Sequence, residues 1–593
     1  MTVTYLSPEV DFQETDNTLT TPQVGVSVGA SVIQSGWGPV LEPQYIDTEN
    51  TMVNIFGKPS DENFKDWLCA ANYLSYVSSM WVVRAKTDGM ANAVATPKDE
   101  TPVVILNDSD YTNNYELGGA DCGQFACKYP GALGNSIMVT YADAATFKNW
   151  KWTDSNGNEH DWTQEFAYPP ATSEYAKERD GKNDEIHLLV VDAGGRISGT
   201  KGTILEKYSF LSKAKDAKTL DGVTSFYRRV LKEQSNYVYW MDFPTTDELE
   251  EEGVGFGKSV VGNTFASLKA PFVAQLKNGA DDFEATDADI MVAFDEFKNA
   301  ESYDLTNIIC GSYSATVAKY IVENICEKRR DCVAFISPNK DGAPIVGNLT
   351  NEDRQAGITT ASAKILSETV KFREHSSFNV NSSYAVMDSA WKYQYDKYND
   401  EYRWVPLCGD TAGLRARTSS NNAPWFSEGG YSRGQYKNVV KLSFNPNKEQ
   451  RDILYPKGIN PAVTFAGEGT ILYGDKTLLT KPSAFQHTNV RFLFIYLEKT
   501  LVSAAKYLLF EINDDVTRTY ARNLVEPFLE EVKGGRGCYD YKVICDESNN
   551  TPEVIDDNMF KMMIKVKPAR SINAIMLDFT AEKTGASMVN ELG

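Results

Sequence analysis

The amino-acid sequence predicts a mixed α/β (α+β) fold divided among several domains. Its 593 residues exceed a single hydrophobic core and suggest roughly three to four domains. An apolar fraction of 42% and an aromatic fraction of 12% supply enough side chains for burial and exclude a disordered chain. Strand-like and helix-like apolar patterns also follow one another along the chain, as expected when sheets and helices share a core.

Residues 1–22 are predicted to form an extended N-terminal arm. Val3, Tyr5 and Val10 belong to a weak strand-like alternation, and the polar stretch QETDNTLTTP that follows predicts a flexible tether. A frayed chain end is the simpler alternative, because termini are often poorly ordered. The segment has neither the basic start nor the apolar core of a signal peptide, so we expect no secretion signal.

Residues 23–95 predict the first part of a core. The alternating stretch GVSVGASVIQ indicates a strand, FKDWLCAANYLSYV a helix and MWVVRA a second strand. This order is typical of a compact α/β unit.

Residues 96–344 are assigned to an inserted domain. FKNWKWTDSNGNEHDWTQEF predicts a hairpin with Asn-Gly in its turn. SKAKDAKTLDGVTSFYRRVLKEQ and ADIMVAFDEFKN indicate helices, and TNIICGSYS with AKYIVENICEKRRDCVAFISP indicates a strand, a helix and a strand. The strand–helix–strand order of these last two segments predicts a small α/β layer.

Residues 345–571 predict the C-terminal part of the core, and residues 572–593 a C-terminal arm and tail. PLCGDTAGLRART is interpreted as a loop, and VRFLFIYLEKTLVSAAKYLLFE as a strand-like start that continues into a helix. TRTYARNLVEPFLEEVKGG indicates a second helix that stops at Gly-Gly. YDYKVICD, MMIKVKPA and NAIMLDF indicate three strands.

Charge, hydropathy and cysteine content indicate which partners the protein can bind and in which compartment it assembles. The net charge, 59 − 81 = −22, argues against a nucleic-acid groove, which needs clustered Lys and Arg. The longest strongly apolar run, near Val490–Leu497, is far below the ~20 residues that cross a bilayer, so we expect no membrane insertion. Nine scattered cysteines indicate reduced thiols and assembly in a reducing cytoplasm.

Two motifs resemble ligand sites and are rejected as such. EGVGFGKS resembles a phosphate loop, but Glu252 replaces the first glycine and would repel phosphate. DSNGNEHDWTQE resembles a calcium loop, but Glu159 occupies the position that needs Gly for the sharp turn. The four histidines have no metal-ligand spacing. We therefore predict no catalytic, cofactor-binding or metal site and no enzyme activity; an acidic multidomain hydrolase with paired carboxylates is the alternative.

Long ordered segments from residue 383 to residue 579 closely resemble the C-terminal core of contractile tail sheath proteins, most nearly the T-even-like phage type. The strongest elements are Gly-Ile-Asn-Pro at 458–461, Val490-Arg491 and Lys-Pro-Ala-Arg at 567–570. Residues 20–95 also match, and the resemblance is patchy between 96 and 344. It implies a discontinuous sheath core with an inserted, outward-facing domain at 96–344 and extended N- and C-terminal arms.

The resemblance also implies how the chain assembles. Sheath arms leave their own subunit and add strands to a small sheet of neighbouring subunits, which satisfies unpaired backbone groups. The subunit–subunit arm residues implied here are Val3, Tyr5, Val10, Ile572, Ile575, Leu577 and Phe579.

The implied function is that of a structural subunit in the virion, assembled in the host cytoplasm. It would polymerise helically around a tail tube and contract to drive the tube through the host envelope for genome ejection. The implied partners are other copies of the chain, the tube protein, the baseplate and the tail terminator or neck proteins. The sheath of a type VI secretion system or a pyocin-like injection system is an alternative.

Overall fold

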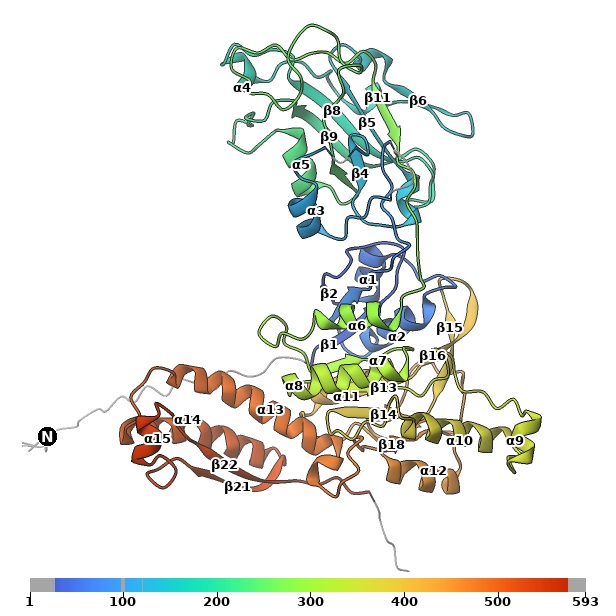
Figure 1. Cartoon of the computed structure of the whole chain (residues 1–593), viewed down its shortest axis with the longest axis vertical. Coiled ribbons are helices and arrows are strands. Elements are labelled where there is room, and N and C mark those ends of the chain that lie inside the picture. Colours follow the sequence, from blue (N-terminus) through green and yellow to red (C-terminus); the bar gives the residue numbers. More distant parts are fainter. Residues whose placement is uncertain (1–26, 97–101, 120, 574–593) are drawn as a thin grey trace, which may run out of the picture.

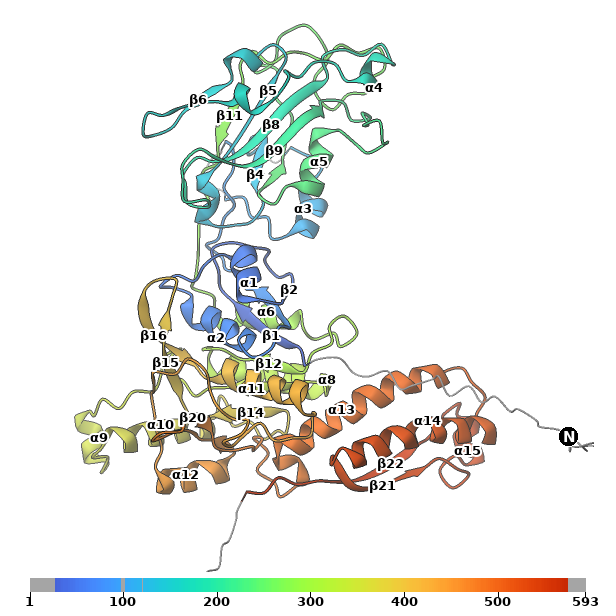
Figure 2. The same cartoon turned by 180° about the vertical axis from the view of Figure 1, so that it is seen from behind.

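The computed structural model describes residues 27–96, 102–119 and 121–573, and it confirms the mixed α/β prediction. A central sheet with its helices carries an inserted part at one end (Figure 1). An elongated C-terminal part extends to one side of the centre, as the reverse view also shows (Figure 2). No helix of the described residues is both long and apolar enough to cross a bilayer.

The central sheet has seven strands in the order β18-β14-β13-β12-β1-β3-β2, and only β2 runs antiparallel to its neighbour. The strands are β1 (Gly29–Ile33), β2 (Gln44–Ile46), β3 (Met80–Arg84), β12 (Asn307–Ile309), β13 (Val333–Ile336), β14 (Ala385–Asp388) and β18 (Ile459–Asn460). β13 is buried along its whole length. Parallel strands covered on both faces read as continuous apolar runs, which is why VAFI shows no polar alternation.

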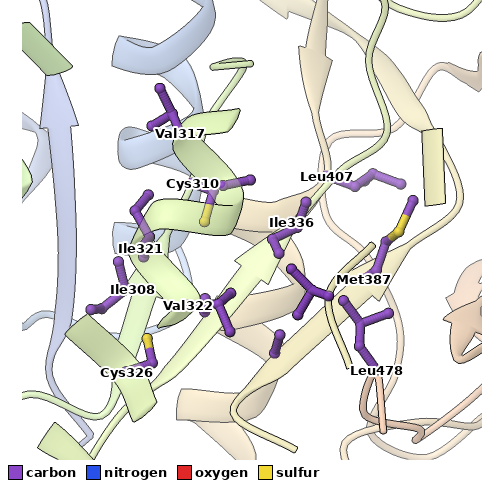
Figure 3. Close-up of a cluster of buried hydrophobic side chains, with 14 of the residues drawn as sticks. Ile308, Cys310, Val317, Ile321, Val322, Cys326, Ile336, Met387, Leu407 and Leu478 are labelled. Atoms are coloured by element: carbon purple, nitrogen blue, oxygen red, sulfur yellow. The ribbon is translucent and has the colours of Figure 1, made fainter. Parts of the chain in front are cut away.

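Helices cover both faces of this sheet, and further short helices, among them α8 (Glu327–Arg329) and α9 (Asn351–Gln355), lie at its periphery. The others are α1 (Glu49–Phe56), α2 (Phe64–Leu74), α6 (Asp287–Asp295), α7 (Ala315–Tyr320), the π-helical turn η4 (Ile321–Cys326), α10 (Ala361–Glu374), α11 (Cys408–Asn421) and α12 (Lys448–Leu454). On one face Ile321 and Val322 point toward Ile308 and Ile336 (Figure 3). On the other face the core contains Phe335 together with residues of α2 and α11.

The prediction of a loop at PLCGDTAGLRART is wrong, because most of it forms α11. The helix packs directly on α2, and small residues permit the close approach. A Cβ atom at Gly409 would lie 2.1 Å from the carbonyl oxygen of Cys69, and one at Gly413 would lie 2.5 Å from the ring of Tyr76. The glycines that suggested a loop are therefore contact residues between two helices.

The inserted part contains an antiparallel sheet in the order β11-β5-β8-β9, a pair β4-β10 and the hairpin β6-β7. The predicted Asn-Gly hairpin is confirmed as β6-β7. The strands are β4 (Phe125–Cys127), β5 (Ile137–Asp143), β6 (Lys151–Thr153), β7 (Glu159–Asp161), β8 (Glu185–Asp192), β9 (Thr203–Ser212), β10 (Val238–Trp240) and β11 (Phe272–Gln275). Its helices are α3 (Asp108–Asn114), α4 (Glu174–Lys177) and α5 (Tyr227–Gln234).

Two expectations about the insert differ from the structure. Within residues 96–344, the strands β12 and β13 belong to the central sheet, so residue 344 is too late for the end of the insert. The predicted strand–helix–strand pattern is confirmed, since β12 and β13 pair with each other. Their outer partners, β1 and β14, come from outside this stretch of sequence. In SKAKDAKTLDGVTSFYRRVLKEQ only α5 is helical, because Gly222 adopts a left-handed turn conformation upstream (φ +82°).

The C-terminal part is built from α13 (Thr488–Ala505), α14 (Asp515–Gly534), α15 (Pro552–Asp556), β21 (Cys538–Ile544) and β22 (Met563–Pro568). The predicted strand-like start of α13 is wrong: the apolar run 490–497 is helical, and most of it is buried. A buried helix and a buried strand both give continuous apolar runs, so periodicity cannot separate them. Two small sheets complete the fold. One has the order β16-β15-β17, with β15 (Trp391–Asp396), β16 (Glu401–Pro406) and β17 (Lys441–Leu442), and the other pairs β19 (Ala462–Phe465) with β20 (Gly469–Leu472).

Candidate functional site

β21 and β22 form a two-stranded antiparallel sheet in the C-terminal part, and within the described residues they pair only with each other. Each strand therefore presents an outer edge whose backbone N–H and C=O groups can pair with a further strand. Tyr541 and Val543 of β21, with Ile564 and Val566 of β22, pack toward the helices beneath. The sheet is thus fixed on one face and open at both edges.

Helices α13 and α14 support this hairpin. Leu493 and Leu497 of α13 are buried in one cluster with Val525 and Leu529 of α14. The two helices lie alongside the strands (Figures 1 and 2) and share a buried cluster with them. An added strand would join a pre-formed sheet rather than create one, which lowers the ordering cost of docking.

A buried ion pair connects the start of α13 to the central part of the molecule. Arg415 of α11 donates to Glu428 at 3.0 Å, and Thr488 donates its hydroxyl hydrogen to the same carboxylate at 3.0 Å. Both charged side chains are almost fully buried. Burial raises the pKa of Glu428, and the attraction of Arg415 opposes this rise.

The chain beyond β22 is held at its base by a buried carboxylate. Asp475 accepts hydrogen bonds from the hydroxyls of Ser571 (2.5 Å) and Tyr455 (3.0 Å), and it lies 3.2 Å from Nδ1 of His487. Asn573 donates to Tyr455 at 3.0 Å. Burial acts to raise the pKa of Asp475, but the hydrogen bonds, first of all that from His487, outweigh it and lower that pKa overall.

Only one of the predicted arm residues falls within the described part of the chain. Ile572 lies between Ser571 and Asn573 and is 80% exposed, so its side chain is available to a partner. The remaining six, Val3, Tyr5, Val10, Ile575, Leu577 and Phe579, lie outside the described residues.

The sequence predicts the two strands of the hairpin but not that their outer edges are free of other described strands. The alternation in YKVI and IKVK signals two half-buried strands. Whether such strands have further neighbours is a tertiary property that alternation does not report.

The two rejected ligand motifs form ordinary turns. Asp154 accepts from the backbone N–H groups of Asn156 and Asn158 and so closes the β6-β7 turn. Ser259, at the end of the phosphate-loop-like segment, donates to Asp216, and the segment is not followed by a helix. Across the residues that the structure describes, no group of three or more His, Cys, Asp or Glu is arranged to hold a metal ion.

Two family descriptions match consecutive parts of the chain. Residues 284–478 match the phage tail sheath protein central domain, and residues 480–582 match the phage tail sheath C-terminal domain. The first match begins just before α6, where the chain returns from the insert to the central sheet.

Individual relatives are similar over nearly the whole chain. The tail sheath protein of Enterobacteria phage T4 is 31% identical, with 98% of each chain covered. That of Salmonella phage ViI is 29% identical over 97% of this chain and 96% of the relative. A crystal structure of a sheath tail protein from Listeria innocua has a TM-score of 0.52 at 10% identity, covering 93% of this chain and 94% of that one, and supports the same fold.

Proposed function

Because the chain belongs to the phage tail sheath protein family and is a structural sheath subunit, we propose that it polymerises helically around a tail tube and contracts to drive the tube through the host envelope. Copies would link by exchanging terminal arms that add strands to the β21-β22 hairpin. The observation that carries this proposal is the hairpin itself, which is supported by two helices and open at both edges.

The arm-exchange contact is heterologous, so it propagates from copy to copy instead of closing on itself. A tether of residues 11–22 spans at most about 40 Å when extended. Neighbouring subunits then slide and rotate during contraction while the strand pairing between them stays intact. Many lateral contacts between subunits are replaced by new ones during contraction, while the arms continue to link each subunit to its neighbours.

We propose that contraction proceeds without nucleotide hydrolysis or any other chemical reaction in this chain. The extended lattice is metastable and held by contacts with the tube, and the contracted lattice buries more surface between subunits. The proposed partners are accordingly the tube protein, the baseplate and the tail terminator or neck proteins, in a virion assembled in the host cytoplasm. The phage relatives favour this over a type VI or pyocin-like machine.

Negative-stain electron microscopy of the purified full chain tests the polymer. Hollow striated tubules of uniform width are expected over a range of protein and salt concentrations. A matched variant that lacks residues 1–10 should stay monomeric with an unchanged thermal unfolding temperature. Tubules of normal appearance from this truncated chain would contradict arm exchange, and monodisperse full-length particles would contradict spontaneous sheath assembly.

A further inference from the structure

A lysine of β15 and an aspartate of α11 meet inside the core. Nζ of Lys392 lies 2.9 Å from Oδ1 of Asp410, and both side chains are fully buried. Nζ also donates to the carbonyl oxygen of Lys437 at 3.1 Å. Oδ2 of Asp410 is buried too, but within the described residues it has no hydrogen-bond partner. A buried carboxylate normally engages both oxygens, so this group is poorly stabilised as an ion.

Burial favours the uncharged forms of this pair. It raises the pKa of Asp410, and the charge and hydrogen bond of Lys392 oppose that rise. Transfer of one proton from the ammonium group to the carboxylate leaves a neutral amine beside a neutral carboxylic acid. The amine is a nucleophile and the acid is an electrophile, and the fold holds the two in contact.

A second carboxyl group lies in the same buried region. Ser337 donates its hydroxyl hydrogen to Asp388 at 2.7 Å and accepts the backbone N–H of Cys408, at the start of α11, at 2.8 Å. Burial raises the pKa of Asp388 to about 8, and the charge of Asp410 adds to this rise. Asp388 therefore carries a proton at neutral pH and adds no negative charge near the pair.

Tyr76 supplies a hydrogen-bond donor to the reacting carboxyl group. Its hydroxyl donates to Oδ1 of Asp410 at 3.0 Å. Burial raises the pKa of Tyr76, so the hydroxyl keeps its proton. Oδ1 is the oxygen that would gain negative charge if Nζ of Lys392 added to the carboxyl carbon, and a donor fixed at that oxygen lowers the barrier. Oδ2, which has no described partner, is the oxygen that can leave.

We propose that Lys392 and Asp410 condense into an intramolecular amide bond after the chain has folded. One proton passes from Nζ to Oδ2, and the Nζ lone pair then forms a bond to Cγ while negative charge develops on Oδ1 beside Tyr76. A second proton passes from Nζ to Oδ2, the Cγ–Oδ2 bond breaks, the Cγ–Oδ1 double bond re-forms and one water molecule departs. Atoms and charge balance without an oxidant or any other co-reactant.

The insert contains a second buried pair that lacks these features. Nζ of Lys213 lies 3.0 Å from Oδ2 of Asp143, and both side chains are fully buried. However, Oδ1 of Asp143 accepts the backbone N–H groups of Ala145 and Thr146, and Oδ2 accepts that of Leu268. Backbone donors on both oxygens stabilise the ionised carboxylate, which is a poor electrophile. We expect this pair to remain an ion pair.

The amide bond would join β15 covalently to α11. The small sheet β16-β15-β17 would then stay attached to a helix of the central sheet even where the noncovalent contacts between them open. The link also closes the loop of residues 392–410, which restricts the unfolded chain as other cross-links do. The inference goes beyond the proposed function and does not depend on arm exchange.

Peptide mass spectrometry of the denatured full-length chain tests the bond. Trypsin does not cleave after a lysine whose Nζ is acylated, so residues 374–397 should be recovered joined to residues 404–415, one water lighter than the two peptides together. In the same digest, cleavage after Lys213 should be complete. Recovery of residues 374–392 and 404–415 as separate peptides would overturn the proposal. Loss of water without a branched peptide would indicate a cyclic imide at Asp410 and would overturn it too.

Two variants test the assigned roles. Lys392→Arg should abolish the branched peptide, and the same linked peptides in this variant would overturn the proposal. Tyr76→Phe should slow formation of the bond by about 10²–10³-fold, followed as the linked fraction over time after cell-free synthesis. Tyr395→Phe, which removes a hydroxyl that donates to Asp400 at an exposed site, is the matched control and should not change the rate. Equal rates in the two tyrosine variants would contradict the role of Tyr76.

Discussion

A buried ion pair connects α13 of the C-terminal part to the rest of the molecule. Arg415 is fully buried, and besides Glu428 it donates to the carbonyl oxygens of Phe426 and Pro424, each at 2.7 Å. Such a pair contributes little net free energy compared with apolar packing, but loss of one partner leaves an uncompensated charge in the interior. The orientation of α13 relative to α11 therefore depends on both Arg415 and Glu428.

Arg415→Met should lower the free energy of unfolding by about 3–5 kcal/mol, because Glu428 stays buried without its cation. The double variant Arg415→Met with Glu428→Leu should recover a large part of that loss. Urea unfolding of the chain lacking residues 1–10, followed by tryptophan fluorescence, measures both under monomeric conditions. A double variant no more stable than Arg415→Met would contradict this account of the pair.

Asp475 should hold the base of the C-terminal segment in a pH-dependent manner. Its folded-state pKa is lowered from 3.8, so its contribution to stability is fully present above about pH 4 and is lost as the pH falls through the folded pKa. Asp475→Asn should accelerate tryptic cleavage after Arg570 at neutral pH. Cleavage after Lys201, in a partly exposed turn of the insert, is the internal control. Equal rates after Arg570 in variant and wild type would refute the anchoring role.

At the scale of elements, close helix packing explains where sequence patterns mislead. α11 contains glycines because it touches α2, and α13 is apolar along its first turns because it is buried on several sides. Composition alone suggests a loop for the first and a strand for the second. In both cases the tertiary contact overrides the local preference.

Gly409→Ala should destabilise the fold by about 1–3 kcal/mol, since the added methyl group would press against the backbone of Cys69. Gly534→Ala is the matched control, because a Cβ atom there meets nothing within 4 Å at the end of α14. That change should be neutral or stabilising by about 0.4–1 kcal/mol. Thermal unfolding of the two variants would contradict the contact if both shifted equally.

At the scale of the whole molecule, the insert is connected to the core through two neighbouring segments. Ala91 and Ala280 exchange backbone hydrogen bonds of 3.1 Å in each direction, so the entering and leaving chains lie side by side. Among the described residues between 85 and 306, none contributes a strand to the central sheet. We therefore predict that the core folds without residues 93–278.

Replacement of residues 93–278 by a short Gly-Ser linker should leave a core that unfolds cooperatively and still forms tubules, of smaller outer diameter. Trp37→Ser should accompany the deletion, because the indole of Trp37 packs on Tyr129 and Tyr237 of the insert. Circular dichroism and electron microscopy report the two outcomes. Loss of cooperative unfolding would show that the insert is part of the core.

Much of the fold was predictable because its signals are local. The helix at residues 64–74, the strand at residues 80–84 and the Asn-Gly hairpin follow from periodicity and turn chemistry. The order of strands in the central sheet was not predictable, because β1 pairs with β12 across more than 270 residues of sequence (Gly29 with Asn307). The residue 344 boundary was wrong for the same reason.

By itself, the sequence determined the mixed α/β class, the alternating arm segments, the acidic charge and the family resemblance, since each is encoded in residue order or local spacing. Only the tertiary structure decided that β21 and β22 pair with no other strand of the described residues, that a groove lies beside β22 and that Lys542 faces Lys565. These features depend on which distant segments pack together. That choice is made by burial across the whole chain, and local patterns do not contain it.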